Sequence, residues 1–210
     1  PRLVAGLAGI LARATNGEEY FQRSTFLADL VGEQVASDLF TLIDDPTLPG
    51  RLGSRPFDGE GIATRRNTLF DAGRFHGFLF DTYNARRSFR RSTGSATRSI
   101  SSLPAIGTGN LLIEPGATSP EEIIAGVRDG LYMTTAMGFG INLVTGDFSR
   151  GAAGIWIRDG QLAEPVTEIN VSGSLPEMLR SIDAVGDDLE WFGATAVPTI
   201  RMSQLTISGS

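Results

Sequence analysis

The chain of 210 residues has a formal net charge of −6, a sequence pI of about 4.8 and no cysteine. The acidic balance excludes a general affinity for the nucleic-acid backbone, and the missing cysteines exclude disulfides, thiolate zinc sites and a cysteine nucleophile. No stretch approaches the roughly eighteen apolar residues of a membrane span. We therefore expect a cytoplasmic protein with one sizeable core that binds neither nucleic acid nor a membrane.

The N-terminal residues predict a buried helix and then a strand. Leu3–Ala14 places its leucine and isoleucine side chains on one helical stripe, with Gly6 and Gly9 leaving room for close backbone approach. Asp38–Asp44 has the composition of a strand, which Asp45-Pro46 ends.

A loop of mixed proline, glycine, arginine and acidic residues follows from Pro49 to Gly61. Within it, Arg55 is close in sequence to Asp58 and Glu60. We expect local ion pairs between them that give the loop a defined shape.

Residues Ile62–Tyr83 predict a hairpin, because apolar and aromatic runs flank the turn signal Asp71-Ala72-Gly73. The only histidine, His76, lies on the second arm of this hairpin. One imidazole cannot build a multi-histidine metal site, so we interpret His76 as a surface or sheet-face residue.

The segment Arg86–Ile106 is rich in arginine, serine, glycine and threonine. This composition predicts a long, mobile surface loop. Its arginines, including Arg86 and Arg87, could grip an anionic or peptide ligand, although a solvated loop is the plainer interpretation.

A second helix is predicted from Pro120 to Met133. Ser119 supplies the N-cap, Pro120 the first-turn proline and Glu122 the capping-box acid. The sequence Met137-Gly138-Phe139-Gly140 is expected to break this helix.

The most informative stretch is Ile141–Ile182. It predicts a strand, a glycine-rich corner, a second strand, a tight Asp159-Gly160 turn and a long third strand. A helix that begins with the capping box Ser174-x-x-Glu177 is expected to follow. The corner Thr145–Gly151 is denser in polar side chains than a plain turn requires. Function is therefore expected there first, although a bulged hairpin is the plainer interpretation.

Asp147, Ser149 and Arg150 are the candidate site residues of this corner. We expect the Asp147 carboxylate to accept backbone N–H groups of the turn, and Arg150 to serve an interface or a bound peptide. A triad of Ser149, His76 and Asp147 can be written down. Because Ser149 is not on a strand-to-helix elbow, a self-contained hydrolase is the weaker alternative.

A closing strand is predicted over Thr199–Ile207. Together the elements predict a single α+β domain over residues 1–210, with predominantly antiparallel β-sheet and about three helices.

Several segments carry a resemblance that runs in register over nearly the whole chain: STFLADLVGEQV, SRPFDGEGIATRR, DTYNARR, GFGINLVTGDFSRGAAGIWIRDGQL, PVTEINVSGSLPEML and PTIRMSQLTISG. Together they resemble the C-terminal domain of the TldD/PmbA (modulator of DNA gyrase) metallopeptidase family. The resemblance implies a chain without the smaller N-terminal domains of that family.

Members of this family are of two kinds. The TldD-type subunit has an HExxxH metal-binding helix in the region of the first helix here, and a cysteine near the C-terminal end completes its site. This chain reads LVAGLAGILARA in the first helix and has no cysteine. It therefore resembles the PmbA type, also called TldE, which lacks the motif.

The resemblance implies a non-catalytic subunit that pairs with a metal-bearing TldD-type subunit and helps to form a chamber for unfolded or leader peptides, such as microcin precursors and antitoxins. Zinc is expected only in that partner, and no cofactor in this chain. The expected peptide-binding or interface residues are Arg86, Arg87, Asp147, Ser149 and Arg150. A homodimer is a further expectation for the isolated chain, and a purely structural homodimeric domain is another alternative.

Overall fold

A computed structural model describes residues 1–138 and 140–209. Over this range the helices are α1 (Arg2–Ala14), α2 (Gly17–Gln22), α3 (Thr82–Arg87), α4 (Pro120–Ala125) and α5 (Leu175–Arg180). The strands are β1 (Leu42–Asp44), β2 (Asn67–Asp71), β3 (Arg74–Phe75), β4 (Ala96–Thr97), β5 (Ala105–Ile106), β6 (Leu111–Ile113), β7 (Asp129–Met137), β8 (Asp147–Arg158), β9 (Gln161–Ser174), β10 (Ile182–Val185), β11 (Glu190–Phe192), β12 (Thr195–Val197), β13 (Ile200–Met202) and β14 (Thr206–Ser208).

The strands form two larger and two smaller sheets. The six-stranded sheet has the order β11-β12-β6-β1-β2-β3, and the four-stranded sheet has the order β14-β9-β8-β7. The smaller sheets pair β10 with β13 and β4 with β5. Only the pairing of β12 with β6 is parallel among the strands named above, so the predicted α+β class with mostly antiparallel sheet is confirmed.

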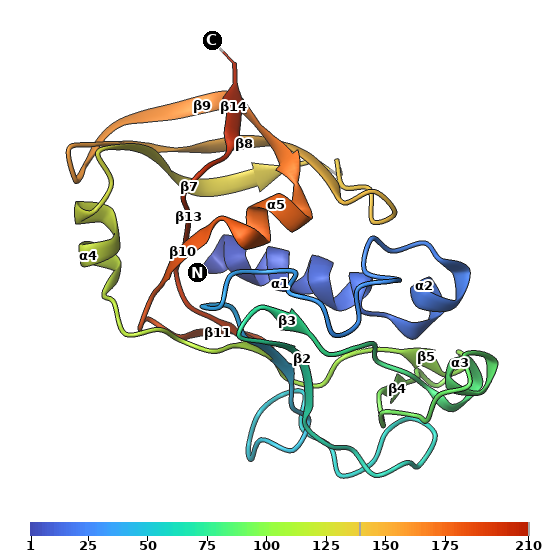
Figure 1. Cartoon of the computed structure of the whole chain (residues 1–210). Coiled ribbons are helices and arrows are strands. Elements are labelled where there is room, and N and C mark those ends of the chain that lie inside the picture. Colours follow the sequence, from blue (N-terminus) through green and yellow to red (C-terminus); the bar gives the residue numbers. More distant parts are fainter. Residues whose placement is uncertain (139, 210) are drawn as a thin grey trace.

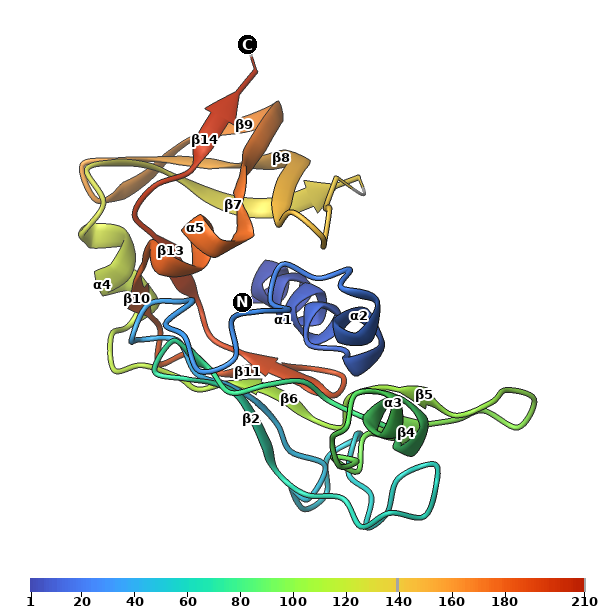
Figure 2. The same ribbon diagram turned by 45° about the vertical axis from the view of Figure 1, so that its right-hand side comes forward.

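Helix α1 lies between the two larger sheets. In Figure 1 the four-stranded sheet is above α1 and the six-stranded sheet is below it, and Figure 2 shows the same order. Ala8, Leu11 and Ala14 belong to the large core on the six-stranded side. Leu7 and Ile10 pack against the smaller core under the four-stranded sheet. The predicted apolar stripe of α1 is thus confirmed. Because the helix lies between two layers, it buries apolar side chains against both of them.

The expectation that the glycines of α1 leave room for a close backbone approach is wrong. Gly6 and Gly9 are both exposed, and a Cβ built on either would meet nothing within 4 Å. They leave one face of the helix without side chains instead.

Aromatic side chains dominate the large core. Phe40, Phe70 and Phe75 are fully buried, and ring centroids lie 5.6 Å apart for Phe40 and Phe70 and 5.1 Å apart for Phe70 and Phe75. The predicted hairpin at Asp71-Ala72-Gly73 is confirmed as β2 and β3, and it carries two of these rings. Such tilted and edge-on pairs add stability beyond burial alone.

The helix predicted over Pro120–Met133 is wrong in its second half. The capping box of Ser119 and Glu122 is present, but α4 ends at Ala125 and the chain becomes β7 four residues later. Pairing with β8 along nearly the whole of β7 outweighs the local helix signal, and Tyr, Met and Thr side chains fit a pleated surface. The predicted helix break therefore has no helix to end, and Phe139 lies outside the described residues.

The capping box predicted for the last helix is also wrong. Helix α5 starts at Leu175, but the Ser174 side chain makes no capping hydrogen bond within the part of the chain that the structure describes. The hairpin turn at Asp159-Gly160 is confirmed, with both residues at positive φ as a two-residue turn between β8 and β9 requires.

The Arg86–Ile106 segment is not one long loop. Arg86 and Arg87 end α3, and Ala96–Thr97 pairs with Ala105–Ile106 as the hairpin β4–β5. The strand predicted over Asp38–Asp44 is confirmed only for its last three residues, and the one predicted over Thr199–Ile207 divides into β13 and β14.

The predicted ion pairs of Arg55 are wrong. Asp58 is buried, and its carboxylate accepts the backbone N–H groups of Glu60 and Ile62, each at 2.9 Å, and of Ala96 at 3.1 Å. Glu60 accepts the Thr82 N–H at 2.8 Å. Both carboxylates accept backbone N–H groups instead of pairing with Arg55. Leaving a buried N–H unpaired costs more free energy than a surface ion pair contributes.

None of the helices described here is long and apolar enough to cross a membrane.

Candidate functional site

The predicted corner Thr145–Gly151 is wrong in its second half, because Asp147–Gly151 belong to β8, and the strand predicted before it is reduced to a single bridge between Ile141 and Phe148. The turn before β8 is held mainly by an asparagine. The Asn142 side-chain oxygen accepts the Val144 N–H at 2.9 Å, and the Asn142 carbonyl accepts the Gly146 N–H at 2.8 Å. Gly146 has φ +82°, which a glycine adopts without strain. Asp147 is exposed, and among the described residues its carboxylate accepts only the Thr145 hydroxyl, at 2.6 Å. The expectation that Asp147 holds the turn's N–H groups is therefore wrong, because Asn142 does so.

Ser149 and His76 lie in different parts of the molecule. The Ser149 hydroxyl accepts the Asn170 side-chain N–H at 3.0 Å across β8 and β9. His76 follows β3 at the edge of the six-stranded sheet, with its Nε2 3.9 Å from Asp71. No hydrogen bond among the described residues joins Ser149 to either His76 or Asp147, so the triad that can be written on paper is not assembled. Without a base in reach, Ser149 has nothing to activate its hydroxyl.

Arg150 is half-buried rather than extended into solvent. Its guanidinium donates to the Ala136 carbonyl of β7 at 3.4 Å, and its Nε is buried without a hydrogen-bond partner in the described part of the chain. Within these residues no carboxylate lies close enough for an ion pair. Arg150 is thus a cation held beside the edge strand β7.

The arginines of α3 are partly occupied by stacking. The Arg87 guanidinium lies over the Phe21 ring at 3.8 Å and the Tyr83 ring at 5.0 Å. Such cation–π contacts fix the side chain. Arg86 is exposed, and no described hydrogen bond or ion pair links α3 to the Asp147–Arg150 corner. The structure therefore does not unite the candidate residues into one site.

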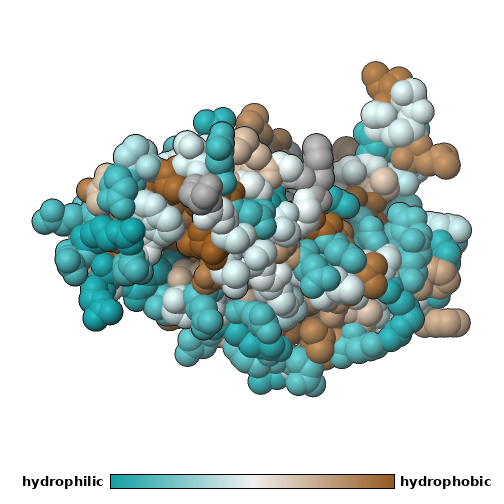
Figure 3. Space-filling view, turned by 90° about the horizontal axis from the view of Figure 1, so that it is seen from above, coloured by the Kyte–Doolittle hydropathy of each residue, from teal (hydrophilic) through white to brown (hydrophobic). Residues whose placement is uncertain are grey.

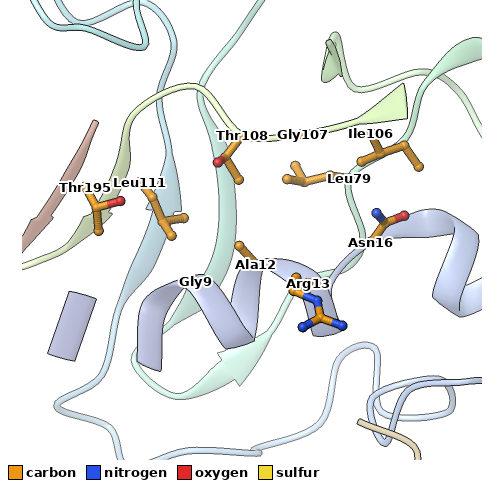
Figure 4. A pocket seen from close by; sticks show the side chains of 10 residues that line it. All are labelled: Gly9, Ala12, Arg13, Asn16, Leu79, Ile106, Gly107, Thr108, Leu111 and Thr195. Carbon is orange, nitrogen blue, oxygen red and sulfur yellow. The ribbon is translucent and has the colours of Figure 1, made fainter. Parts of the chain in front are cut away.

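A cleft that the sequence did not indicate lies beside α1 (Figure 4). Its volume is about 240 Å³. One wall is α1, and the other comes from residues of β5, β6 and β12, the segment between β5 and β6, and Leu79. It is lined by Gly9, Ala12, Arg13, Asn16, Leu79, Ile106, Gly107, Thr108, Leu111 and Thr195. The bare Gly9 opens it, since a side chain there would occupy the space. The only hint in the sequence was the glycine of a helix that should favour alanine.

The cleft is suited to apolar groups and backbone, not to acid–base or metal chemistry. No carboxylate, imidazole or thiol lines it. Asn16 is engaged, because its side-chain oxygen accepts the Glu18 N–H at 2.8 Å as the N-cap of α2. In Figure 4 the Arg13 guanidinium points away from the wall of Leu79 and Thr108. What remains is a small hollow of mixed character, with the apolar side chains of Leu79, Ile106 and Leu111 beside two threonine hydroxyls.

A second hollow of about 340 Å³ contains His76, together with Arg66, Asn67 and Thr93. Arg66 is paired with Glu114 at 3.1 Å, outside the lining. No residue in this hollow combines with His76 as a nucleophile or a second imidazole.

No group of three or more His, Asp or Glu side chains in the described residues is arranged to hold a metal ion. The helix that would carry HExxxH in the metal-bearing subunits has no His and no acidic residue at all. The donor set at α1 therefore does not fit a metal.

Asp44 is a buried carboxyl group at the end of β1. Burial raises its pKa to about 6, against the opposing effects of the Gly109 N–H bond and the nearby Arg55 charge. Its Oδ1 accepts the Gly109 N–H at 2.6 Å, while Oδ2 and the Arg55 Nε and Nη2 are buried without partners among the described residues. Asp44 is the last residue of β1 in the six-stranded sheet and does not itself line the cleft, although its partner Gly109 follows the lining residue Thr108. Because it holds this backbone in place, its role is structural.

The comparisons with known proteins agree on one family. The family described as PmbA/TldA metallopeptidase C-terminal domain matches residues 1–209. The metalloprotease PmbA of Escherichia coli O157:H7 is 35% identical over 207 residues, which cover 99% of this chain and 44% of that protein.

Two crystal structures share the fold. One, described as a modulator of DNA gyrase from Bacteroides thetaiotaomicron, has a TM-score of 0.90 at 34% identity and covers 100% of this chain and 46% of its own. The other, TldE from Thermococcus kodakarensis, has a TM-score of 0.88 at 31% identity and covers 97% and 48%. The chain thus spans less than half the length of these relatives. It belongs to the PmbA/TldD metallopeptidase family, as that family's C-terminal domain, and it lacks the HExxxH motif.

Proposed function

We propose that this chain is the non-catalytic, PmbA/TldE-type subunit of a two-subunit metalloprotease. It pairs with a metal-bearing TldD-type subunit in the cytoplasm and helps to form the chamber that receives unfolded or leader peptides. The observation that carries the proposal is α1, which the family resemblance places where the metal-bearing subunits have HExxxH, but which has no His or acidic residue and presents Gly9, Ala12 and Arg13 to a small cleft.

The geometry near α1 supports a peptide-holding role. Strand β7 is an edge of the four-stranded sheet, and its Leu131 and Met133 pack in the same cluster as Leu7 and Ile10 of α1. An extended peptide can add to such an edge through main-chain hydrogen bonds, which do not depend on its sequence. The cleft between α1 and the six-stranded side is a separate place that can take a side chain. Sequence-tolerant binding of this kind suits unfolded peptides such as microcin precursors and antitoxins.

A self-contained hydrolase remains the alternative of another class, and the geometry favours it less. Ser149 is paired with Asn170 rather than with a base, and Asp147 is occupied by a threonine hydroxyl. A purely structural homodimer is compatible with the absence of a catalytic group, but it leaves the cleft beside α1 without a role.

The deciding experiment is co-expression with a metal-bearing TldD-type subunit, followed by affinity purification, metal analysis and a peptide-cleavage assay. We expect a stoichiometric complex that cleaves unfolded peptides, with metal only in the partner. The isolated chain, after extensive dialysis, should hold no stoichiometric zinc. About one tightly bound zinc per isolated chain, or peptide cleavage by the chain alone, would contradict the proposal.

A matched pair of variants tests the cleft within that complex. Gly9→Leu should fill the cleft and lower peptide cleavage, whereas Gly6→Leu lies one turn away on the same exposed helix face, outside the cleft lining, and should leave cleavage unchanged. Equal effects of the two substitutions would remove the cleft from the proposal.

A further inference from the structure

The end of α3 carries an exposed phenylalanine in a conformation that favours glycine. The Phe89 N–H donates to the Arg86 carbonyl at 3.2 Å, and the Arg90 N–H donates to the Ala85 carbonyl at 2.8 Å. These two bonds form a Schellman motif, in which the residue at the Phe89 position is left-handed and is usually glycine. Phe89 has φ +55° and is 98% exposed. Packing of the ring therefore does not offset the strain of the backbone.

Phe89 is unfavourable for the folded domain in two ways. It strains the backbone, and it leaves an aromatic ring in water. Local conflicts of this kind, which stabilise nothing within the domain, are typical of functional positions. Aromatic side chains are also frequent anchors of binding surfaces. Phe89 is therefore a candidate anchor for another molecule.

Arginines precede and follow this ring, and the segment around it has no acidic residue. Residues 82–113 contain five of the 18 basic residues and none of the 24 acidic residues. Arg86, Arg90 and Arg91 are exposed, and no ion pair among the described residues involves them. Arg87 is instead held by its stacking on two aromatic rings. Because the remainder of the chain is strongly acidic, the free arginines form a basic surface on an acidic protein.

The hairpin β4–β5 continues this combination of basic and apolar side chains. Figures 1 and 2 place α3 beside β4 and β5. In the space-filling view of Figure 3 the hairpin is the lobe at the upper right, with brown apolar side chains at its outer end. Its tip carries Ile100 and Leu103, which are 104% and 87% exposed, and Arg98 precedes them. A ligand that complements this part of the molecule needs both carboxylates and apolar groups.

We propose that the Phe89 surface, consisting of Phe89, Arg86, Arg90 and Arg91, binds unfolded peptide segments that combine acidic and apolar side chains. The peptide carboxylates pair with the arginines, and an apolar peptide side chain covers the ring. A single-stranded nucleic acid also combines charge with stacking, but each nucleotide adds a negative charge that the acidic remainder of the chain repels. This inference rests on the proposed function only where the peptide is a substrate, and it then names the preferred substrate class.

The test is fluorescence anisotropy of a labelled synthetic peptide of glutamate and leucine residues, titrated with the chain at low and at physiological salt. We expect binding that weakens as salt rises, and a dissociation constant at least about tenfold higher when glutamine replaces glutamate in the peptide. Phe89→Gly should raise the dissociation constant at least about tenfold without lowering the melting temperature, because glycine suits the left-handed conformation. A purely structural Phe89 would give the reverse, a lower melting temperature with unchanged binding.

Two matched controls test whether the effects belong to the Phe89 surface. Leu52→Gly makes the same type of change at a position that is 83% exposed but lies outside this surface, and it should leave binding unchanged. The double variant Arg90→Gln/Arg91→Gln should weaken binding and reduce its salt dependence, whereas Arg128→Gln, at an exposed position before β7, should not. Equal binding of the glutamine peptide, equal weakening by Leu52→Gly, or tighter binding of single-stranded oligo(dT) than of the acidic peptide would overturn the inference.

The complex with a metal-bearing subunit separates this inference from the proposed function. If both are right, Phe89→Gly should raise the KM for an acidic peptide and leave kcat unchanged. A complex that cleaves peptides while Phe89→Gly changes neither binding nor KM would overturn the inference and support the proposed function. If the isolated chain binds the acidic peptide as expected but the complex cleaves no peptide, the proposed function is wrong and the Phe89 surface is confirmed as a peptide-binding surface.

Discussion

In the four-stranded sheet, β7, β8 and β9 follow one another along the chain, whereas the centre of the six-stranded sheet joins strands that are far apart in sequence, because β6 pairs with both β12 and β1. β7, β8 and β9 are consecutive and have 9, 12 and 14 residues. In the six-stranded sheet, β6 lies between β12 and β1. The strands of this sheet have between two and five residues. Long local ladders stabilise the first sheet through backbone hydrogen bonds, while the second depends on what its short strands bury.

The two cores differ accordingly. The large cluster on the six-stranded side contains the fully buried aromatic rings, whereas the cluster under the four-stranded sheet has fewer buried side chains, with Phe148 as its one buried ring among the described residues. The free energy gained by burying side chains scales with the apolar area removed from water. Most of the stability should therefore come from the core between α1 and the six-stranded sheet. Of the two surfaces that the proposed function uses, the β7 edge belongs to the less buried sheet, whereas the cleft lies between α1 and the six-stranded side, with Leu111 of β6 and Thr195 of β12 in its lining.

The largest expected effect is on the free energy of unfolding when a core ring is removed. Phe70→Ala should cost about 3–5 kcal/mol, because it leaves a cavity between Phe40 and Phe75. Phe148→Ala, at the rim of the smaller core, should cost clearly less. Urea denaturation of both variants measures the difference. Equal losses would show that the two cores contribute alike and would break the comparison.

The pH dependence of the free energy of unfolding tests the buried Asp44 carboxyl group of β1, in the six-stranded sheet. The pKa of Asp44 is raised to about 6 in the folded chain, above its ordinary value of 3.8, so the folded state holds this proton more tightly than the unfolded state. Its contribution is therefore favourable at low pH and is lost as pH rises from about 4 to 6, by on the order of 3 kcal/mol.

Asp44→Asn removes the charge and keeps an oxygen that can accept the Gly109 N–H. The variant should be no less stable than the wild type at pH 7, and its stability should fall less between about pH 4 and 6. Thermal melts across that range give the two slopes. Parallel slopes would mean that Asp44 does not carry the burial cost assigned to it.

Local signals in the sequence predicted well whatever local bonds decide. The turn at Asp159-Gly160, the hairpin at Asp71-Ala72-Gly73 and the apolar stripe of α1 were all predictable, because each depends on neighbours in sequence. Strand β7 was missed because a strong capping box precedes it and its partner strand lies about twenty residues further along. The family resemblance, by contrast, was carried by motifs spread over the whole chain and needed no correct secondary structure.

Contacts between distant residues explain the other misses. The hairpin β4–β5 is held at its base by the Asp58 carboxylate, which accepts the N–H of Ala96, 38 residues further along the chain. The cleft combines Gly9 with Thr195, which no pattern of spacing connects. Asn142 could have been preferred over Asp147 as the residue that holds the turn, since asparagine commonly bonds the backbone two residues ahead.

Substitutions of Asp147 and Arg150, at the start of β8, should change the free energy of unfolding less, and they separate a structural from a functional role. Asp147→Ala removes one exposed hydrogen bond and should cost less than about 1 kcal/mol. Arg150→Ala removes a weak bond to the Ala136 carbonyl together with a buried unpaired Nε, so it should also change stability by no more than about 1 kcal/mol.

In the complex with a metal-bearing subunit, Arg150→Ala should lower peptide cleavage and Asp147→Ala should not, because Arg150 is the cation beside the β7 edge. Paired melting and cleavage data decide between the roles. If Arg150→Ala melts the domain, and a stabilising substitution elsewhere recovers full cleavage, the functional role of Arg150 is wrong.

The smallest expected effect concerns the exposed face of α1, between the two sheets. Gly6→Ala and Gly9→Ala should each stabilise the isolated chain by about 0.5–1 kcal/mol, because alanine lowers the entropy of the unfolded chain and both positions have open space for a Cβ. Equal gains in denaturant midpoint would show that the helix gives up stability at both positions. At Gly9 the missing side chain leaves the cleft open, so a gain in stability there that accompanies a loss of cleavage by Gly9→Leu would show that the glycine is kept for the cleft. A loss of stability in Gly9→Ala alone would instead mean that this face packs against another part of the chain, and the cleft would not be open in solution.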